Sequence, residues 1–201
     1  IVTVVCLGTA TTDSLTTEVM KNVTSKFPQL LTPAKSVPAI EYRRVFPTGE
    51  EHYFHTATPT EIVEVDNNHE WSRTGYTFNV YPLDQAPSDT IAVARFYGGK
   101  RSNSVYGNPD SHFFTASFDE RQFLINLFPK NCPQGWGHCD GGDAWYFEGE
   151  KYRVYLPTNS SCPEGTRPLY RLYNQAYTTA GNLNPIYPNR ISNHRYTVDL
   201  G

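Results

Sequence analysis

Three arginines and three histidines recur in short, strand-like segments of the chain. A metal or catalytic centre would need the three histidines to converge on one point. Repetition of one residue type in similar segments is more typical of a shared structural need, such as bonding loop carbonyls and stacking on aromatic rings. We therefore interpret six residues as structural: Arg44, Arg95, Arg171, His52, His112 and His194.

Acidic residues are the next candidates for chemistry. Asp119 and Glu120 could act as a general acid and base, but at a helix start they serve the helix terminus first. Asp140 and Asp143 resemble part of a calcium loop without the remaining ligands of an EF-hand, so a turn is favoured. The sequence holds no nucleophile-elbow, zinc-protease, P-loop or dinucleotide motif. We expect no enzyme, no catalytic residue, no metal and no cofactor.

Aromatic residues flanked by Asn and Asp gather in three long connections, at residues 98–111, 130–144 and 175–192. This combination suits sugars, whose C–H faces stack on aromatic rings while their hydroxyls bond amides and carboxylates. The alternative is that the rings only fix the loops to the fold. The candidate ligand-binding residues are Tyr106, Trp136, Asp140, Asp143, Tyr177 and Tyr187.

An internal repeat would position these residues. Each arginine segment is followed by a histidine segment, and in the first two units a helical pattern then opens at Glu61 and at Glu120. The same five residue types follow at identical offsets from Trp71 and from Trp145: Trp, Gly, an aromatic residue, Val and Tyr. Alternation near the end of each run predicts a half-buried strand.

The repeat predicts an all-β protein with short helices. Three units, at about residues 40–82, 91–157 and 168–201, would close around a pseudo-threefold axis as a β-trefoil-like barrel and hide their sheet edges. A β-propeller is the alternative, although it would normally need more blades. The high aromatic content of 14% and the frequent Gly and Pro residues agree with a turn-rich β fold.

The third unit is incomplete in this chain, whereas the N-terminal strand Ile1 to Cys6 has no assigned place. The simplest expectation is that this strand fills the gap, either within one molecule or between molecules. Residues 1–38 thus hold the strand, a helical pattern from Thr16 to Phe27 and a Pro-containing linker, ahead of a repeat domain at 39–201.

The four cysteines favour disulfides and an oxidising compartment. A short loop with Pro and Gly favours Cys132–Cys139, which leaves Cys6–Cys162. Zinc is the alternative, because His138 adjoins a cysteine, but the paired spacing of structural zinc sites is missing. Two sequons add candidate glycosylation sites at Asn22 and Asn159.

The charge balance argues against two classes of partner. Seventeen Lys and Arg against 20 Asp and Glu give a net charge of −3, which offers no attraction to nucleic acid or to an anionic membrane. No stretch approaches the about 20 apolar residues of a membrane span. We expect no nucleic-acid partner and no membrane insertion.

Three stretches resemble a secreted repeat family of bacteria and fungi whose function is unknown: residues 168–174, 112–121 and 192–197. In that family the third unit usually runs on into a helix and a strand ending near a Cys, and Val4-Val5-Cys6 looks like that final strand. His55 departs from the family, in which Thr is usual. Members often adjoin extracellular hydrolases, which implies an accessory or binding role and supplies no catalytic residue.

These observations lead to two functional hypotheses. The first is a secreted, non-catalytic module that binds a glycan or cell-wall polymer through its loop aromatics. The alternative is a structural subunit of an extracellular filament, in which residues 1–6 complete a neighbouring molecule and build a head-to-tail oligomer.

Overall fold

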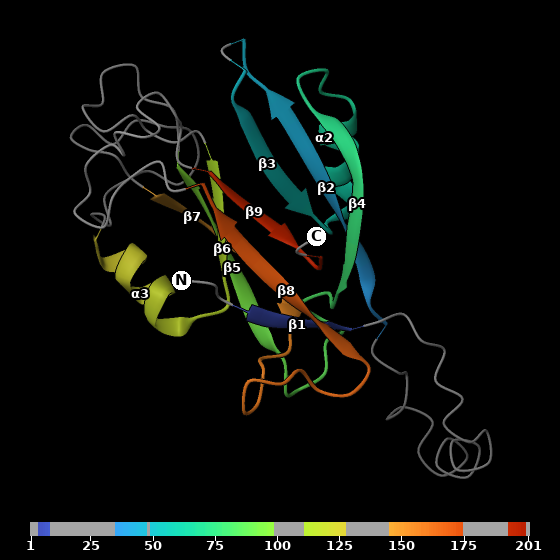
Figure 1. Ribbon diagram of the computed structural model, residues 1–201, viewed down its shortest axis with the longest axis vertical. Coiled ribbons are helices and arrows are strands. Elements are labelled where there is room, and N and C mark those ends of the chain that lie inside the picture. Colours follow the sequence, from blue (N-terminus) through green and yellow to red (C-terminus); the bar gives the residue numbers. More distant parts are fainter. Residues whose placement is uncertain are drawn as a thin grey trace.

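The computed structural model describes residues 4–8, 35–47, 49–98, 111–127, 145–174 and 193–199. These residues are mostly β-structure, arranged as three antiparallel sheets of three strands each, with two helices (Figure 1). The all-β expectation is therefore confirmed. The described strands form three separate sheets and no closed barrel.

Each sheet has the same plan, in which a central strand lies between two edge strands. The first sheet holds β2 (Val37–Val45) between β3 (Glu51–Thr56) and β4 (Ser72–Val80). The second holds β5 (Ile91–Gly98) between β6 (Ser111–Thr115) and β7 (Trp145–Val154). The third holds β8 (Thr166–Tyr173) between β9 (His194–Thr197) and β1 (Val4–Gly8).

The third sheet is complete within its own chain. Strand β1 pairs with β8 along its whole length, from Val4 opposite Tyr170 to Gly8 opposite Thr166. The N-terminal strand therefore takes the place that β4 and β7 take in the other sheets. The incomplete third unit expected from the sequence is thus completed by the first strand of the same chain.

Two helices follow the second strand of the first two sheets. Helix α2 (Pro59–Asp66) begins with Pro at its first turn, where the missing N–H costs nothing. Helix α3 (Phe118–Leu127) begins after Ser117, whose hydroxyl accepts a hydrogen bond from the Glu120 N–H at 3.3 Å. Both helices start two residues earlier than the pattern indicated. Among the described residues no helix follows β9.

Matching positions of the three sheets converge in the core. Three rings from matching strand positions meet there: His55 of β3, Phe114 of β6 and Tyr196 of β9. The ring centroids are 3.7 Å apart for His55 and Phe114, 5.4 Å for Phe114 and Tyr196, and 5.1 Å for His55 and Tyr196. A second buried layer is formed by Val80, Val154 and Leu7, each 1% exposed. Because each layer takes one residue from each sheet, the two layers show which residues occupy equivalent positions in the three sheets.

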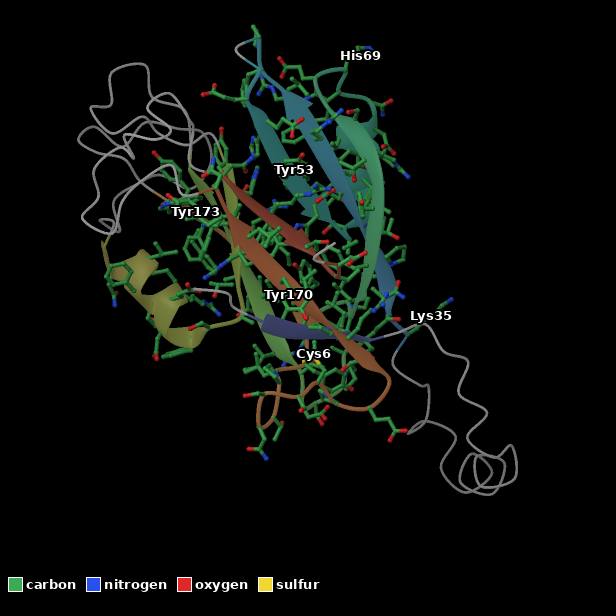
Figure 2. All side chains as sticks on the ribbon, viewed as in Figure 1. Cys6, Lys35, Tyr53, His69, Tyr170 and Tyr173 are labelled. Atoms are coloured by element: carbon green, nitrogen blue, oxygen red, sulfur yellow. A yellow bond between two sulfur atoms is a disulfide. The ribbon has the colours of Figure 1, made fainter. Side chains whose placement is uncertain are left out.

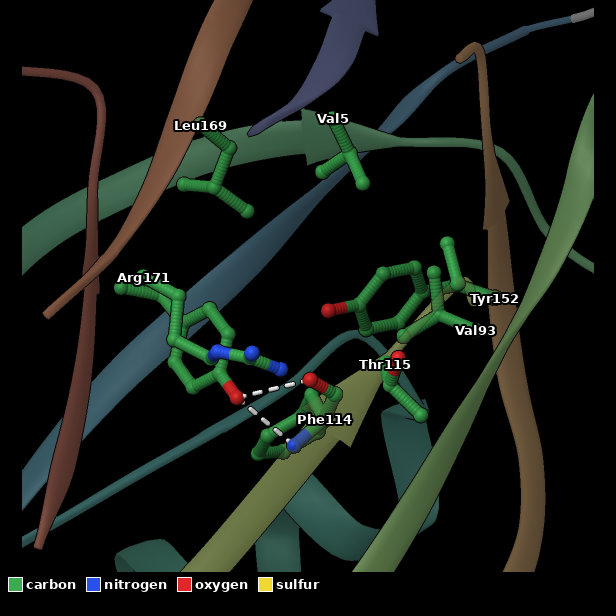
Figure 3. A pocket seen from close by; sticks show the side chains of 9 residues that line it. Val5, Val93, Phe114, Thr115, Tyr152, Leu169 and Arg171 are labelled. Carbon is green, nitrogen blue, oxygen red and sulfur yellow. Dashed lines mark hydrogen bonds between the residues drawn. The ribbon is translucent and has the colours of Figure 1, made fainter. Parts of the chain in front are cut away.

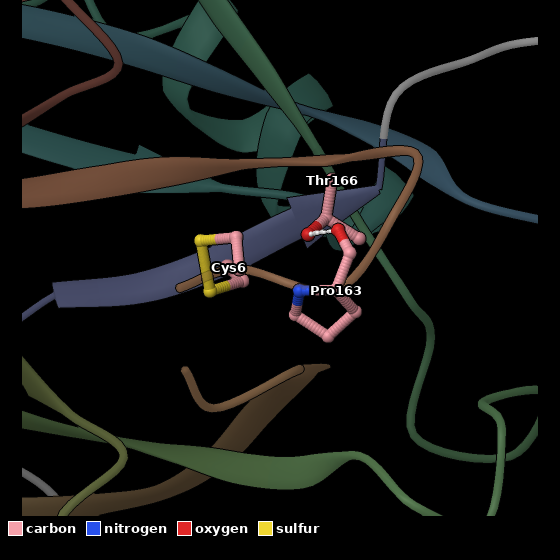
Figure 4. The surroundings of a disulfide bond; sticks show 4 residues. Cys6, Pro163 and Thr166 are labelled. Atoms are coloured by element: carbon pink, nitrogen blue, oxygen red, sulfur yellow. Dashed lines mark hydrogen bonds between the residues drawn. A yellow bond between two sulfur atoms is a disulfide. The ribbon is translucent and has the colours of Figure 1, made fainter. Parts of the chain in front are cut away.

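Backbone hydrogen bonds and a disulfide connect the sheets near the ends of β4 and β7. Cys6 exchanges two backbone hydrogen bonds with Tyr155, and Tyr81 exchanges two with Arg153, so β1, β7 and β4 are joined at their ends. A disulfide links Cys6 to Cys162 across 156 residues, as the cysteine pattern predicted (Figure 4). The second expected pair, Cys132–Cys139, lies outside the described residues.

Candidate functional site

The three sheets meet at charged contacts, which we call seams. At the first seam, between the first two sheets, Arg95 of β5 donates to both oxygens of Glu61 on α2, at 2.9 and 2.7 Å. Its Nε donates to Glu148 of β7 at 2.8 Å, and its guanidinium lies 4.9 Å from the ring centroid of Phe54. Only 4% of the Arg95 side chain is exposed, so its charge depends on these carboxylates for compensation.

The second seam repeats this arrangement between the second and third sheets. Arg171 of β8 donates to both oxygens of Glu120 on α3, at 3.0 and 2.8 Å. Its guanidinium lies 4.6 Å from the ring centroid of Phe113. Because Phe113 and Glu120 hold the places of Phe54 and Glu61, the two seams are the same contact made twice.

At the third seam, between the third and first sheets, the charges are exchanged. Glu41 of β2 holds the place of Arg95 and accepts two hydrogen bonds from Arg195 of β9, at 3.1 and 3.0 Å. Arg195 holds the place of Phe54, and its guanidinium lies between Tyr53 and Tyr76, 4.5 and 5.1 Å from their ring centroids. The buried charge is thus negative here and its partner positive.

This geometry corrects the alignment expected for the first unit. Arg44 lies three residues beyond the place of Arg95 and Arg171, at the end of β2, where it pairs with the exposed Glu70 at 3.0 Å. His52 lies one position away from the place of His112 and His194, which Tyr53 occupies instead. The arginines and histidines are therefore not three copies of one position.

His52 and His112 form a hydrogen-bonded pair at the first seam. His112 Nε2 lies 3.4 Å from Glu148 Oε2, and His112 Nδ1 lies 3.0 Å from His52 Nε2. The partners assign the tautomers: His112 donates to the carboxylate and accepts from His52. His52 Nδ1 is then a buried acceptor, and it has no hydrogen-bond donor among the described residues.

Burial dominates the electrostatics of all these histidines. It lowers the pKa of His52 to about 2, assisted by His112 and Arg44, and the pKa of His194 to about 3, assisted by Arg171. Burial also lowers the pKa of His112, although Glu148 opposes this. The carboxyl of Glu148 is itself buried, but the hydrogen bond from His112 and the charge of Arg95 outweigh that and lower its pKa to about 2.

The carboxylates at the seams are held as partners of arginine. Glu120, one of the two acidic residues considered for acid–base chemistry, accepts from Thr115 as well as from Arg171, and these bonds outweigh burial and lower its pKa. Asp119 is exposed beside it at the helix start. No group of three potential metal ligands occurs among the described residues. The seam bonds run between neighbouring sheets, from Arg95 to Glu61, from Arg171 to Glu120 and from Arg195 to Glu41.

A small pocket lies between the second and third sheets (Figure 3). Its volume of about 20 Å³ holds about one water molecule. Its wall is mostly apolar, with Thr115, Arg171 and the hydroxyls of Tyr152 and Tyr196 as polar members. Tyr152 bonds His55 at 2.7 Å, and Tyr196 donates to the Phe114 carbonyl at 2.8 Å. This pocket is too small for a sugar ring.

The connections after β5 and β8 start and finish at one end of the structure, and the connection after α3 finishes there at Trp145. We call this the hairpin end. Strands β5, β6, β7, β8 and β9 all have an end there, at the upper left of Figure 1. Gly98 pairs with both Ser111 and Trp145, and the Asn174 N–H donates to the Asn193 carbonyl at 3.2 Å. The Asn193 side chain bonds the Glu51 carbonyl and so ties this end to the first sheet.

The candidate ligand-binding residues lie outside the described residues, in the connections that leave the hairpin end. These are Tyr106, Trp136, Asp140, Asp143, Tyr177 and Tyr187. The sequon at Asn22 also lies outside them. Asn159 is described and exposed, in a turn closed by Thr158 and Ser161, which is the accessibility that a glycan acceptor requires.

Sequence reasoning missed the acidic half of the seams. Glu41, Glu61 and Glu148 carry no local motif, because their partners lie 34 to 154 residues away in the chain. One signal was available: Glu61 and Glu120 hold the same place in their units, and each precedes an arginine strand.

A comparison with protein-family models gives one finding. The model described as a domain of unknown function (DUF5648) matches residues 23–131, which is more than half of the chain. The chain belongs to this family. The match covers the first sheet with α2, and β5, β6 and α3 of the second unit, but it stops before β7. The curated proteins and the solved structures contain no match to the chain. Among the described residues, no helix is long and apolar enough to cross a membrane.

Proposed function

We propose that the three sheets form a β-trefoil-like scaffold for a secreted, non-catalytic module that binds carbohydrate or a cell-surface polymer. The observation that carries the proposal is the hairpin end. Three inserted connections, rich in aromatic residues and Asn, have flanking residues there that are bonded or paired to one another: Gly98 with Ser111, Gly98 with Trp145, and Asn174 with Asn193. Loops on a rigid scaffold are where binding residues concentrate.

Two further observations support this function. The seams use their buried charges to hold the sheets in place, so the scaffold gives the loops fixed anchor points. The Cys6–Cys162 disulfide is of the kind that persists in an extracellular setting. Strand β1 pairs with β8 of its own chain, so nothing in the structure calls for exchange of this strand between molecules, and we do not carry the filament forward.

A glycan array with the purified chain tests the proposal. We expect a defined set of sugars to bind, and substitution of Tyr106, Trp136 or Tyr187 by Ala to reduce the affinity at least tenfold. Phe118→Ala is the matched control, because Phe118 is an exposed aromatic residue at the start of α3, which follows the end of β6 opposite to Ser111. Failure of the folded chain to bind any glycan or cell-wall polymer would refute the proposal, as would equal losses in the control.

A further inference from the structure

Arg195 at the third seam keeps part of its guanidinium available to a group from outside. Its Nε and Nη2 donate to Glu41, whereas its Nη1 donates to no described residue and is not buried. Arg95, in contrast, uses all three of its nitrogens on Glu61 and Glu148. The Arg195 side chain is 35% exposed, against 4% for Arg95.

Two tyrosine rings flank this guanidinium. The ring centroid of Tyr53 lies 4.5 Å from the Arg195 guanidinium carbon, and that of Tyr76 lies 5.1 Å from it. The Tyr53 hydroxyl is used within the protein, because it donates to Glu51. Tyr76 is 56% exposed, and its hydroxyl bonds no residue in the described part of the chain. Tyr76 therefore offers a ring and a hydroxyl to solvent beside the guanidinium.

A β-bulge in β4 projects Tyr76 to this place. Three residues of β4 lie opposite the single residue Glu41 of β2. Gly75, in the middle of the three, has a positive φ of 88°, which turns the backbone sharply. At the matching position of β7, Glu150 bonds Arg121 of α3, whereas the Tyr76 ring contacts Arg195. Bulges often re-aim a side chain next to a binding site.

We propose that Arg195 and Tyr76 form a subsite for a sugar that carries a carboxylate, such as a uronic acid. This inference rests on the proposed function and names the class of carbohydrate. The remaining N–H groups of Nη1 and Nη2 form a planar fork that suits a carboxylate. The exposed Tyr76 ring suits the C–H face of a sugar ring. A uronic acid carries both features, whereas a neutral sugar lacks the first and a simple acid lacks the second.

The subsite lies beside the hairpin end. Arg195 follows two residues after Asn193, whose side chain bonds the Glu51 carbonyl of β3. Strands β3 and β9 lie side by side there (Figure 1). A chain of sugars bound at Arg195 can therefore also reach Asn193, where the connection after β8 rejoins the sheet.

The two acidic side chains nearest to the subsite are already paired. Glu41 accepts from Arg195 and, at 2.8 Å, from Thr74, and Glu51 accepts from Arg43 at 3.1 Å. Arg43 lies opposite Tyr53 in the sheet and adds a second, partly exposed cation. An incoming carboxylate therefore meets acids whose charge is compensated, and we expect its binding to weaken as salt is added.

NMR titration of the isotope-labelled full chain with trigalacturonate tests the subsite. We expect the largest shifts at the Nε–H of Arg195 and the amide of Tyr76, and about tenfold weaker binding of the methyl ester of the probe and of acetate. Equal binding of the acid and its ester would overturn the subsite. Shifts confined to Gly98, Ser111 and Trp145 would also overturn it, because they place the probe elsewhere on the hairpin end and leave the proposed function standing.

Three variants separate this site from general glycan binding. Tyr76→Ala should weaken trigalacturonate binding about fivefold, while Tyr76→Phe, which keeps the ring, should retain most of it. Phe118→Ala is the control, because Phe118 is an exposed aromatic residue on α3. Equal affinities in Tyr76→Ala and the control would contradict the subsite. If the array shows that other glycans bind but trigalacturonate does not, this inference fails alone; if no glycan binds, the proposed function fails as well.

Discussion

Glu41 and Arg195 form the contact that Arg95 and Phe54 form elsewhere, with a buried anion and a cation in place of a buried cation and an aromatic ring. Glu41 lies in the place of Arg95, and Arg195 in the place of Phe54. The contact between the third and first sheets is therefore chemically unlike the other two, although its geometry is the same. Only one cyclic order of the sheets pairs every buried charge with an opposite one.

Exchanging the charges back tests this relationship. Glu41→Arg alone should lower the free energy of unfolding by about 3 kcal/mol, because it buries two arginines against each other. Adding Thr74→Glu and Arg195→Phe rebuilds the surroundings of Arg95, since Thr74 holds the place of Glu148. We expect the triple variant to regain at least half of the loss in urea unfolding. A triple variant less stable than Glu41→Arg would show that the sites are not equivalent.

Removing the guanidinium of the first seam should destabilise the protein strongly. Arg95→Met leaves Glu61 and Glu148 facing each other without a cation, at a cost of about 3 kcal/mol in urea unfolding. Arg73→Met is the matched control: Arg73 also binds a carboxylate, Asp66, but half of its side chain is exposed. We expect the control to lose much less stability, because solvent screens an exposed ion pair. Similar losses in both variants would contradict a special role for Arg95.

Stability should fall in mild acid because of the buried histidines. The pKa of His194 is lowered to about 3 and that of His52 to about 2, against about 6.5 in the unfolded chain. Below pH 6.5 the unfolded chain binds protons that the folded chain does not, so folding free energy is lost as the pH falls toward 3. Each histidine should contribute about 1.4 kcal/mol per pH unit.

Urea unfolding between pH 7.5 and 4.5 measures this effect. His194→Gln should reduce the slope of stability against pH by about one proton. The same substitution at His69, which lies exposed on the surface in Figure 2, serves as the control for the loss of a histidine. An unchanged slope in His194→Gln would show that this histidine binds protons equally in the folded and unfolded states, against the lowered pKa.

The Cys6–Cys162 disulfide should carry a large part of the stability of the third sheet. It closes a loop of 156 residues, and opening such a loop costs about 4–5 kcal/mol in the chain-entropy view. We expect Cys6→Ser with Cys162→Ser to lower the stability by this order. Hydrogen exchange should show β1 losing its protection before β2 and β5. Uniform loss of protection in all three sheets would contradict a local role for the bond.

Local patterns of the sequence predicted much of this fold, because a strand leaves a local signature. The shared offsets from Trp71 and Trp145 locate β4 and β7, and the Gly four residues later, Gly75 and Gly149, has a positive φ of 88° and 95° in both. Such a backbone favours Gly, so its spacing marks the same bend in two sheets.

Contacts between sheets could not be predicted in the same way. Arg44 matched Arg95 and Arg171 by residue type, but position in a sheet depends on register, and in the first unit that position is taken by Glu41. Glu41 and Arg195 keep the geometry of the other two seams, but the shared residue type by which the sequence could be aligned is absent from the first unit. The candidate ligand site rests on loop composition, and its residues lie outside the part of the chain that the structure describes.

The strand order β1–β8–β9 has a consequence for synthesis of the chain. Strand β1 is made long before its partners, because β8 and β9 follow it by more than 150 residues in the chain. The first two sheets each consist of segments that are close in the chain, so they can assemble one after the other. Until β8 is made, the apolar residues Val5 and Leu7 have no partner strand to cover them and stay exposed to solvent. Closure of the third sheet, and of the bond between Cys6 and Cys162, must therefore wait until almost all of the 201 residues have been made.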